Sequence, residues 1–378
     1  MKYFTLDLFR GLAALWVFAY HFDFSSHFRD LFPTLTKLFS IGHLGVPIFF
    51  VISGYCITTS ARRSIAREAN TLSFIYRRLR RIYPPMWCSA ILFVVGPWLV
   101  QWILAVKTGE YQSPPNHRLE FLQFGFWDWV RITSLSEIFV GQAPGSPNVK
   151  LKFVEFNPPY WSLAIEVQFY LVVAICLALP RKFFLKSMTV VTVLSFVSLL
   201  LGLPESYGFF VNHWPGFAFG AILAILIEKG YDPAKAHSLF SQVAFSVVGL
   251  SCFYIAIING MTNGGSSKAF AFLFAFGLWA IRPIDLAIEQ KTESKTWNGI
   301  IKTLAFPGII SYSIYLLHFK LSIVIREFAM MLLPWHPIAI DITVVLTTCL
   351  LCVPFYFLCE KPFASHAPKE DQRKQAAT

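Results

Sequence analysis

The sequence predicts an all-α integral membrane protein, a polytopic bundle of about ten transmembrane helices with both termini in the cytoplasm. Three observations lead to this fold class. The chain is 56% hydrophobic and only 14% charged, whereas soluble proteins are about 45–50% apolar and about 25% charged. Apolar runs long enough to cross a bilayer recur along almost the whole chain. Lys and Arg residues are concentrated in alternate connections between these runs.

The predicted membrane helices are the segments with about 20 mostly apolar residues, the length that crosses a bilayer. They cover residues 5–24, 42–60, 86–106, 160–180, 187–204, 208–228, 240–259, 267–282, 304–331 and 338–358. An even number of spans puts both ends of the chain on one side of the membrane. The long connection 107–159 falls on the opposite side, and its stretch Phe121–Val140 is expected to lie along the membrane surface.

The distribution of positive charge predicts the orientation. Most Lys and Arg residues, including a cluster between the second and third segments, fall on the side of the termini, which is therefore cytoplasmic. This topology accounts for the net charge of +11 without a nucleic-acid partner, because no basic stripe lies on a soluble domain. We expect one membrane domain over residues 1–363 and a short polar cytoplasmic tail over residues 364–378. The seven cysteines lie in or beside apolar segments, and neither a disulfide framework nor a metal site is predicted.

The first segment contains two ionisable residues, Arg10 and His21, which are costly inside a membrane. They are eleven residues apart, which is close to three helical turns, so both side chains share one face and lie about 16 Å apart along the axis. Asp7 can pair with Arg10 one turn away. A functional pair is favoured over the alternative, in which Arg10 reaches the interface and His21 makes a packing hydrogen bond.

The second segment contains the sequence from Gly45 to Tyr55, which includes Pro47, Ser53 and Gly54. Pro and Gly at these positions are typical of a helix that bends or packs closely against a neighbour. Ordinary helix packing and a role in shaping a site explain this pattern equally well.

Four arginines, Arg77, Arg78, Arg80 and Arg81, precede the third segment on the cytoplasmic side. Arginine binds phosphate groups through two parallel hydrogen bonds, so the cluster is suited to a polyphosphate ligand. Topology and anionic lipid headgroups explain the same cluster, and from these residues alone they are the stronger interpretation.

Two further ionisable side chains lie inside predicted membrane helices. Glu166 is about two turns into the fourth segment, where an unpaired carboxylate would have to protonate or find a base, so use in a site is favoured over simple pairing. His318 in the ninth segment could be a catalytic group, a substrate contact or a packing group, and the sequence favours none of the three.

Six short elements in this order resemble the acyltransferase 3 family of integral-membrane acyltransferases. The resemblance extends from Leu6 to Phe363. The elements are Arg10 with His21; Phe49, Phe50, Ser53 and Gly54; the arginine-rich stretch Tyr76 to Pro84; Trp161, Ser162, Leu163, Glu166, Phe169 and Tyr170; Tyr315 to His318; and Glu360 to Phe363. Each element alone is weak, whereas six in the right order are specific.

The resemblance implies O-acylation of a carbohydrate hydroxyl, often acetylation of a surface polysaccharide, with acyl-CoA (acetyl-CoA) as a donor co-substrate and no permanently bound cofactor. It also implies a bacterial cytoplasmic (inner) membrane location. Many relatives carry an extra soluble domain after the membrane part; the short polar tail predicts a stand-alone form. The oligomeric state is not predicted.

Roles for the candidate residues follow from this activity. An imidazole suits proton transfer at neutral pH, so His21 is expected to act as general base or as acyl-carrying nucleophile, with Glu166 orienting an imidazole or relaying its proton. Arg10 and the four arginines before the third segment are expected to hold the phosphates of CoA. The remaining expected substrate contacts are Ser53, Tyr170 and His318.

Two other function classes fit parts of the pattern. A membrane transporter of a sugar or an ion would also place Arg, Glu and His inside its helices. Such transporters often show paired halves with matching broken helices, and no such pairing is visible in the sequence. A catalytically inactive scaffold is the third possibility, and the intact set of six elements argues against it.

Overall fold

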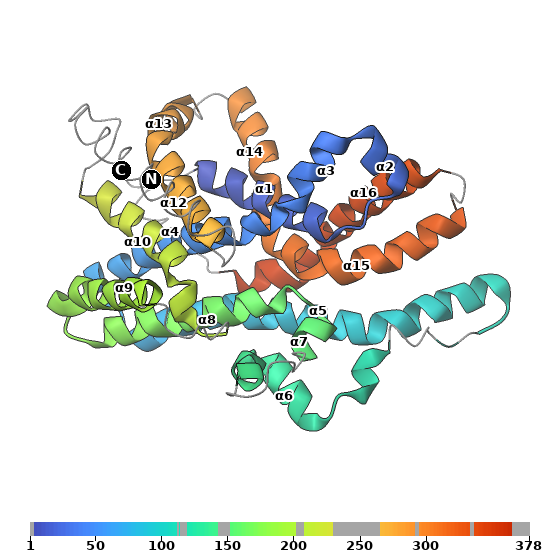
Figure 1. Ribbon diagram of the computed structural model, residues 1–378, viewed down its shortest axis with the longest axis horizontal. Coiled ribbons are helices and arrows are strands. Elements are labelled where there is room, and N and C mark those ends of the chain that lie inside the picture. The colour runs from blue at the N-terminus through green and yellow to red at the C-terminus, as the bar shows by residue number, and fades with distance from the viewer. Residues whose placement is uncertain are drawn as a thin grey trace.

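The computed structural model describes residues 4–111, 113, 119–142, 152–201, 208–229, 265–291, 295–332 and 336–364. Within these ranges every regular element is a helix (Figure 1). The α-helices are α1 (Phe4–His21), α2 (Ser26–Leu31), α3 (Pro33–Ser40), α4 (Gly45–Ala66), α5 (Thr71–Thr108), α6 (Phe126–Ser134), α7 (Lys152–Phe156), α8 (Tyr160–Ala178), α9 (Phe184–Leu200), α10 (Trp214–Glu228), α12 (Gly265–Ala280), α13 (Arg282–Lys291), α14 (Lys295–Ile309), α15 (Ser311–Leu332) and α16 (Pro337–Phe355).

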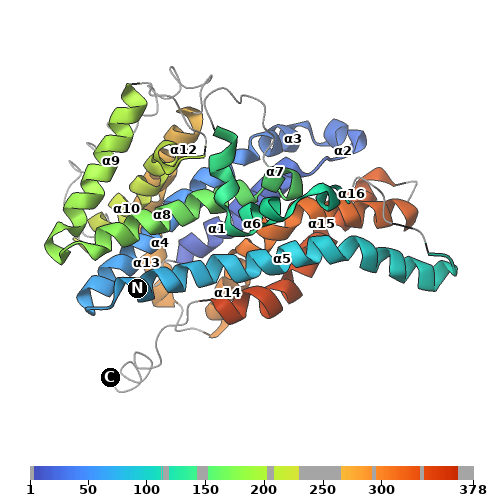
Figure 2. The same ribbon diagram turned by 90° about the horizontal axis from the view of Figure 1, so that it is seen from below.

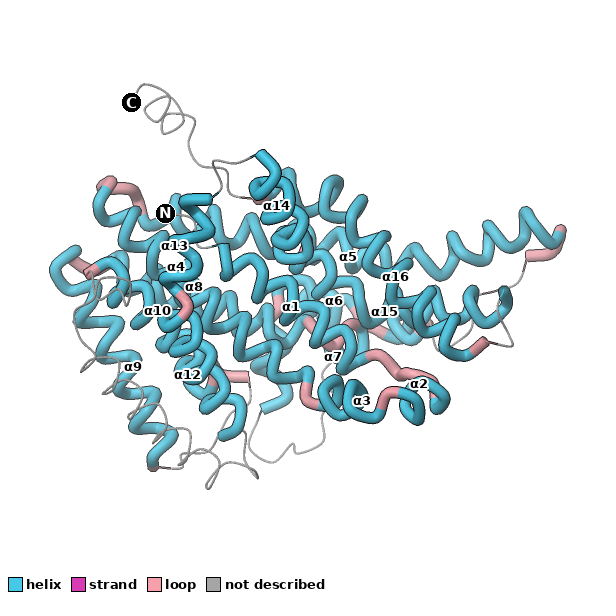
Figure 3. Tube along the Cα trace, turned by 90° about the horizontal axis from the view of Figure 1, so that it is seen from above, coloured by secondary structure: helices cyan, strands magenta, loops and turns pink. Residues whose placement is uncertain are grey.

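The first helix, α1, is surrounded by other helices. It contacts α4, α14 and α15, which come from distant parts of the chain. Helix α5 runs along the molecule beside α8 and α15, and α8 packs against α4 (Figures 1 and 2). The tube view shows the same all-helical arrangement from above, the side opposite to that of Figure 2 (Figure 3). This arrangement brings residues near both ends of α1 into the interior of the bundle.

The described helices confirm an all-α membrane protein. Four of them are long and apolar enough to cross a membrane, or five if one bent pair forms a single span; shorter apolar helices occur at Trp214–Glu228 and Ser267–Ala280. The predicted helix 240–259 and the predicted tail from residue 365 onward lie outside the described residues. The number of about ten spans and the cytoplasmic termini therefore stay predictions.

The predicted single helix over residues 304–331 is wrong. The structure has two helices there, α14 and α15, which are bent by 50° at a break. Pro307 lies just before this break and lacks a backbone N–H. At Gly308 an added Cβ atom would lie 1.8 Å from the backbone oxygen of Asp7. The chain therefore bends where α14 crosses the backbone of α1.

Helix α5 is longer than the predicted segment 86–106, because it already begins at Thr71. Asn70 caps its N-terminus, and its side chain accepts a hydrogen bond from the backbone N–H of Leu72 at 2.8 Å. The arginine cluster consequently lies on a regular helix rather than in a connection before it. Its four side chains are therefore distributed around the helix.

The glycines of α4 and α10 allow these two helices to touch through their backbones. A Cβ atom at Gly54 would lie 2.0 Å from the backbone oxygen of Phe217, and one at Gly220 would lie 1.9 Å from that of Val51. Of the two interpretations of the second segment, close packing is therefore realised. The crossing also fixes the position of Ser53, the residue before Gly54.

The long connection after α5 packs against the bundle. Helix α6 falls inside the stretch expected to lie along the membrane surface, and its last turn accepts hydrogen bonds from Tyr83 and Trp87 of α5, each 2.9 Å long. After α7, the Asn157 side chain donates to the backbone oxygen of Leu316 in α15 at 3.0 Å. These contacts anchor the connection to α5 and α15; its placement along a membrane surface stays a prediction.

Candidate active site

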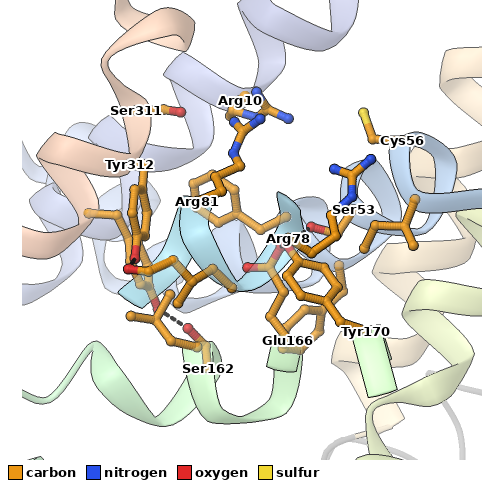
Figure 4. Close-up of a pocket in the computed structure, with 16 residues that line it drawn as sticks. Arg10, Ser53, Cys56, Arg78, Arg81, Ser162, Glu166, Tyr170, Ser311 and Tyr312 are labelled. Atoms are coloured by element: carbon orange, nitrogen blue, oxygen red, sulfur yellow. Dashed lines mark hydrogen bonds between the residues drawn. The ribbon is translucent and has the colours of Figure 1, made fainter. Parts of the chain in front are cut away.

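Three arginines line a cavity between α1, α4, α5, α8 and α15, which we call the arginine cavity (Figure 4). Its volume is about 110 Å³. The lining residues are Arg10, Phe49, Phe50, Ser53, Cys56, Ile57, Arg78, Arg81, Ile82, Ser162, Leu163, Glu166, Tyr170, Ser311, Tyr312 and Tyr315. Since typical ligand pockets measure about 300–1,000 Å³, this space holds only part of a large ligand.

The four predicted phosphate-binding arginines separate into two pairs. Arg78 and Arg81 are three residues apart on α5, so they share a face and both line the arginine cavity. Arg80 points to another side, where it donates to the backbone oxygen of Pro362 at 2.9 Å. Arg77 is not among the residues that line the cavity. The structure therefore brings only two of the four predicted phosphate-binding arginines into this cavity, because the helix turns the other two side chains away; their predicted contact with CoA stays a prediction.

Arg10 joins this cavity from α1 and lies 3.8 Å from Asp7, as the spacing predicted. The Asp7 side chain is half-exposed, at 49%, so the pair is partly screened by solvent. Glu166 is the single carboxylate among the lining residues, against three guanidinium groups. The excess of positive charge suits an anionic ligand.

Glu166 is held by hydroxyl groups. Ser53 Oγ donates to its Oε1 atom at 2.9 Å, and Tyr170 OH donates to the same atom at 2.6 Å. The role of Glu166 in relaying a proton stays a prediction, and the structure does not show its predicted contact with an imidazole. The reason is the helix order, because α8 faces α4 and α5 at this level while the neighbour of His21 comes from α15.

Several hydroxyl groups complete the wall of the arginine cavity. Ser162 Oγ and Tyr315 OH form a hydrogen bond, and Tyr312 OH donates to the backbone oxygen of Ile82 at 2.8 Å (Figure 4). Tyr312 was not a candidate from the sequence. Its position next to the α14–α15 break aims it at α5, and this break was not predicted.

His21 lines a second cavity of about 380 Å³, which we call the histidine cavity. Its lining residues are Val17, Tyr20, His21, His43, Val46, Pro47, Phe50, Trp161, Asn212, His213, Gly216, Ser267, Lys268 and Ala271. Phe50 lines both cavities, so its ring lies where they meet. Arg10 and His21, on one helix, thus face two adjoining spaces. His43, His213 and Lys268 were missed because they lie in connections or near helix ends that carry no motif.

His21 is in contact with the second predicted intramembrane histidine. His318 Nε2 lies 3.3 Å from His21 Nδ1, and the ring centroids are 5.2 Å apart. The His318 side chain is completely buried, with 0% of its surface exposed. His318 lines neither cavity, so of the three interpretations left open for it the geometry does not favour a substrate contact.

Comparison with known proteins now decides the family. Residues 3–357 match the model of a family described as an acyltransferase domain, which covers nearly the whole chain. The chain belongs to the acyltransferase 3 family. Five of the six family elements contribute residues to the walls of the two cavities, one on each of α1, α4, α5, α8 and α15. The sixth, Glu360 to Phe363, follows α16 and lines neither cavity.

Two similar proteins carry names that describe acetyl transfer to oxygen. The chain is 31% identical over 234 residues to an O-acetyl transferase of Shigella phage Sf6, a match that covers 59% of this chain and 60% of the phage protein. It is 25% identical over 380 residues to the O-acetyltransferase OatA of Staphylococcus aureus, covering 94% of this chain and 56% of that protein. The chain thus matches only a little over half the length of these relatives. No solved structure matches it.

Proposed function

We propose that this protein is a membrane O-acyltransferase that moves an acetyl group from acetyl-CoA to a hydroxyl group of a carbohydrate, such as a surface polysaccharide or a lipid-linked sugar. The observation that carries the proposal is the pair of adjoining cavities, one cationic and one containing imidazoles, which share Phe50. The names of the two relatives support acetyl transfer to oxygen. The proposed location is a bacterial inner membrane with both termini in the cytoplasm.

The arginine cavity is the proposed site of the donor. Arg10, Arg78 and Arg81 supply three guanidinium groups, which suit the phosphates of CoA. Glu166 carries the opposite charge among them, and its contacts with Ser53 and Tyr170 give it a role on this donor side. Because the cavity is only about 110 Å³, it is proposed to hold one phosphate group of CoA, with the rest of the donor, including the pantetheine arm that leads to the thioester, outside it.

The histidine cavity is the proposed site of the acceptor. Its lining combines the aromatic side chains of Tyr20 and Trp161 with polar groups such as Asn212, the composition typical of specific small-molecule sites. At about 380 Å³ it is the larger of the two spaces. His21 is part of its wall, so a sugar hydroxyl in this cavity would lie next to the imidazole.

The proposed reaction uses His21 for proton transfer. As the sugar oxygen attacks the thioester carbon, its proton passes to the imidazole; the carbon–sulfur bond then breaks, and the CoA thiolate takes up that proton. In the alternative sequence His21 attacks the thioester first and carries the acetyl group before the sugar accepts it. Both sequences need a lone pair on a ring nitrogen of His21.

The test is reconstitution of the purified protein in vesicles with radiolabelled acetyl-CoA and a lipid-linked oligosaccharide. We expect label in the sugar with the native chain and at least about a hundredfold slower labelling with His21→Ala, while His27→Ala serves as a control because His27 is exposed on α2. Sugar flux across the vesicle without consumption of acetyl-CoA would instead favour a transporter. Equal activity of native protein and His21→Ala would exclude the assigned role of His21.

A further inference from the structure

The hydrogen bonds around the histidine pair assign the protons of both rings. His318 Nδ1 lies 3.1 Å from the backbone oxygen of Ile314 and 3.0 Å from that of Tyr315. Carbonyl oxygens only accept hydrogen bonds, so this nitrogen must carry a proton. In a neutral imidazole the other nitrogen, Nε2, is then an acceptor.

The proton on the His21 ring is assigned in the same way, from the acceptors around its Nδ1 atom. Its Nδ1 atom lies 3.0 Å from the backbone oxygen of Val17, another acceptor, and 3.3 Å from Nε2 of His318. Both neighbours accept, so Nδ1 of His21 must be the protonated nitrogen and is shared between them. The Val17 carbonyl and the His318 ring, which come from different helices, thus require the same tautomer.

We propose that His318 is a positioning residue that holds His21 with its proton on Nδ1, so that Nε2 keeps its lone pair and faces the histidine cavity. Among the described residues no hydrogen bond is formed by Nε2 of His21, and the partly buried ring lines that cavity. The assignment of the tautomer does not depend on the proposed function. Its importance for catalysis does rest on that function, because a general base or a nucleophile requires a lone pair, here on Nε2.

The surroundings of His318 hold its ring in place. Phe18 and Tyr315 lie against it with ring centroids 5.7 and 6.0 Å away, and the side chain is 0% exposed. A buried ring with both nitrogens engaged cannot turn without losing hydrogen bonds. The orientation of His21 is therefore set from α15 as well as from its own helix.

Three substitutions at His318 separate positioning from packing. In His318→Gln the amide oxygen reaches the place of Nε2 and can still accept from Nδ1 of His21. In His318→Asn the amide is too short to reach His21, although it can replace Nδ1, and His318→Phe fills the space without polar atoms. We expect kcat to stay within about threefold for the Gln variant and to fall by at least about tenfold for the Asn and Phe variants, with KM for both substrates within about twofold.

Labelling of histidine with ¹⁵N gives a readout that does not depend on activity. The nitrogen shifts of the protein in lipid nanodiscs, assigned by comparison with His21→Ala, distinguish protonated from unprotonated ring nitrogens. At mildly alkaline pH we expect a proton on Nδ1 of His21 in the native chain and a mixture of tautomers in His318→Phe. A proton on Nε2 in the native chain, or equal kcat values for the Gln and Phe variants, would overturn the proposal. Native spectra as expected without acetyl transfer would reject only the proposed function.

Discussion

The arginine cavity and the histidine cavity adjoin each other but are built for different tasks. In the arginine cavity, formal charges dominate, with three guanidinium groups around one carboxylate that is held by Ser53 and Tyr170. In the histidine cavity the wall carries imidazoles, and that of His21 is held by hydrogen bonds to acceptors only. The first arrangement suits an anionic ligand, whereas the second is proposed to present a lone pair. The difference predicts that donor binding and chemistry can be changed separately in this chain.

The largest expected effect comes from the histidine cavity. His21→Ala removes the group proposed to take the hydroxyl proton, and general acid–base catalysis contributes about 10²- to 10⁴-fold to a rate. We expect kcat for acetyl transfer to fall by that factor and the Kd of CoA, measured by calorimetry, to stay within about twofold. The His27→Ala control should match the native chain. A Kd that rises as steeply as kcat falls would break the separation of the two cavities.

The second effect should be confined to the arginine cavity. Replacing Arg78 and Arg81 together by Gln removes two charges from its wall. Hydrogen bonds to charged groups are worth about 1.5–3 kcal/mol each, and losing one therefore costs about 10- to 150-fold in affinity. We expect KM for acetyl-CoA to rise at least about tenfold, while KM for the sugar is unchanged.

The control for this pair is Arg77→Gln, which removes one positive charge from the same helix outside the cavity. If Arg77→Gln raised KM for acetyl-CoA as much as the double variant, general attraction between the helix and the donor would explain the effect. The assignment of the arginine cavity as the donor site would then have no support from this experiment.

The third effect should not discriminate between the cavities. Gly54 lets α4 touch α10, and α4 supplies walls to both spaces through Phe50, Ser53 and Pro47. A Cβ atom 2.0 Å from the Phe217 oxygen forces the helices apart, and overpacking of this kind costs about 1–3 kcal/mol. We expect Gly54→Ala to lower the Tm in detergent and to weaken donor and acceptor binding alike.

Gly96→Ala is the control for this substitution, because nothing lies within 4 Å of an added Cβ atom there. It should leave the Tm unchanged or raise it slightly, since alanine favours a helix over glycine. Equal Tm values for the Gly54 and Gly96 variants would show that the close crossing does not constrain the bundle.

Local periodicity was enough to predict some of the site from the sequence. The eleven-residue spacing on one helix put Arg10 and His21 on one face, and the structure has them lining adjoining cavities. The same periodicity separates Arg78 and Arg81 from Arg80 once Asn70 is taken as the N-cap of α5, because the cap extends the helix back over the arginine cluster.

The partners of Glu166 and His318, and the break before α15, depend on contacts between helices that are distant in the sequence. Whether Glu166 meets an imidazole or a hydroxyl is decided by the register of α8 against α4, and whether His318 meets His21 is decided by α15 against α1. No local pattern encodes these registers. The break before α15 likewise combines a local signal, Pro307, with a tertiary one, the backbone of α1 at Gly308. A proline alone does not break a helix here, since α5 contains three of them.

The smallest expected effect comes from Phe50, the residue that lines both cavities. The Phe50 ring is 6% exposed and packs edge-on against Trp161, Phe169 and His213. Phe50→Leu keeps an apolar side chain but removes part of this ring, so water from one cavity can reach the other. We expect acetyl-CoA hydrolysis without a sugar to rise about two- to fivefold relative to transfer, because excluding water suppresses such side reactions.

The control is Phe319→Leu, which changes a ring of α15 that contacts His21 but lines neither cavity. Unchanged partition between hydrolysis and transfer in Phe50→Leu would mean that another group keeps water away from the thioester.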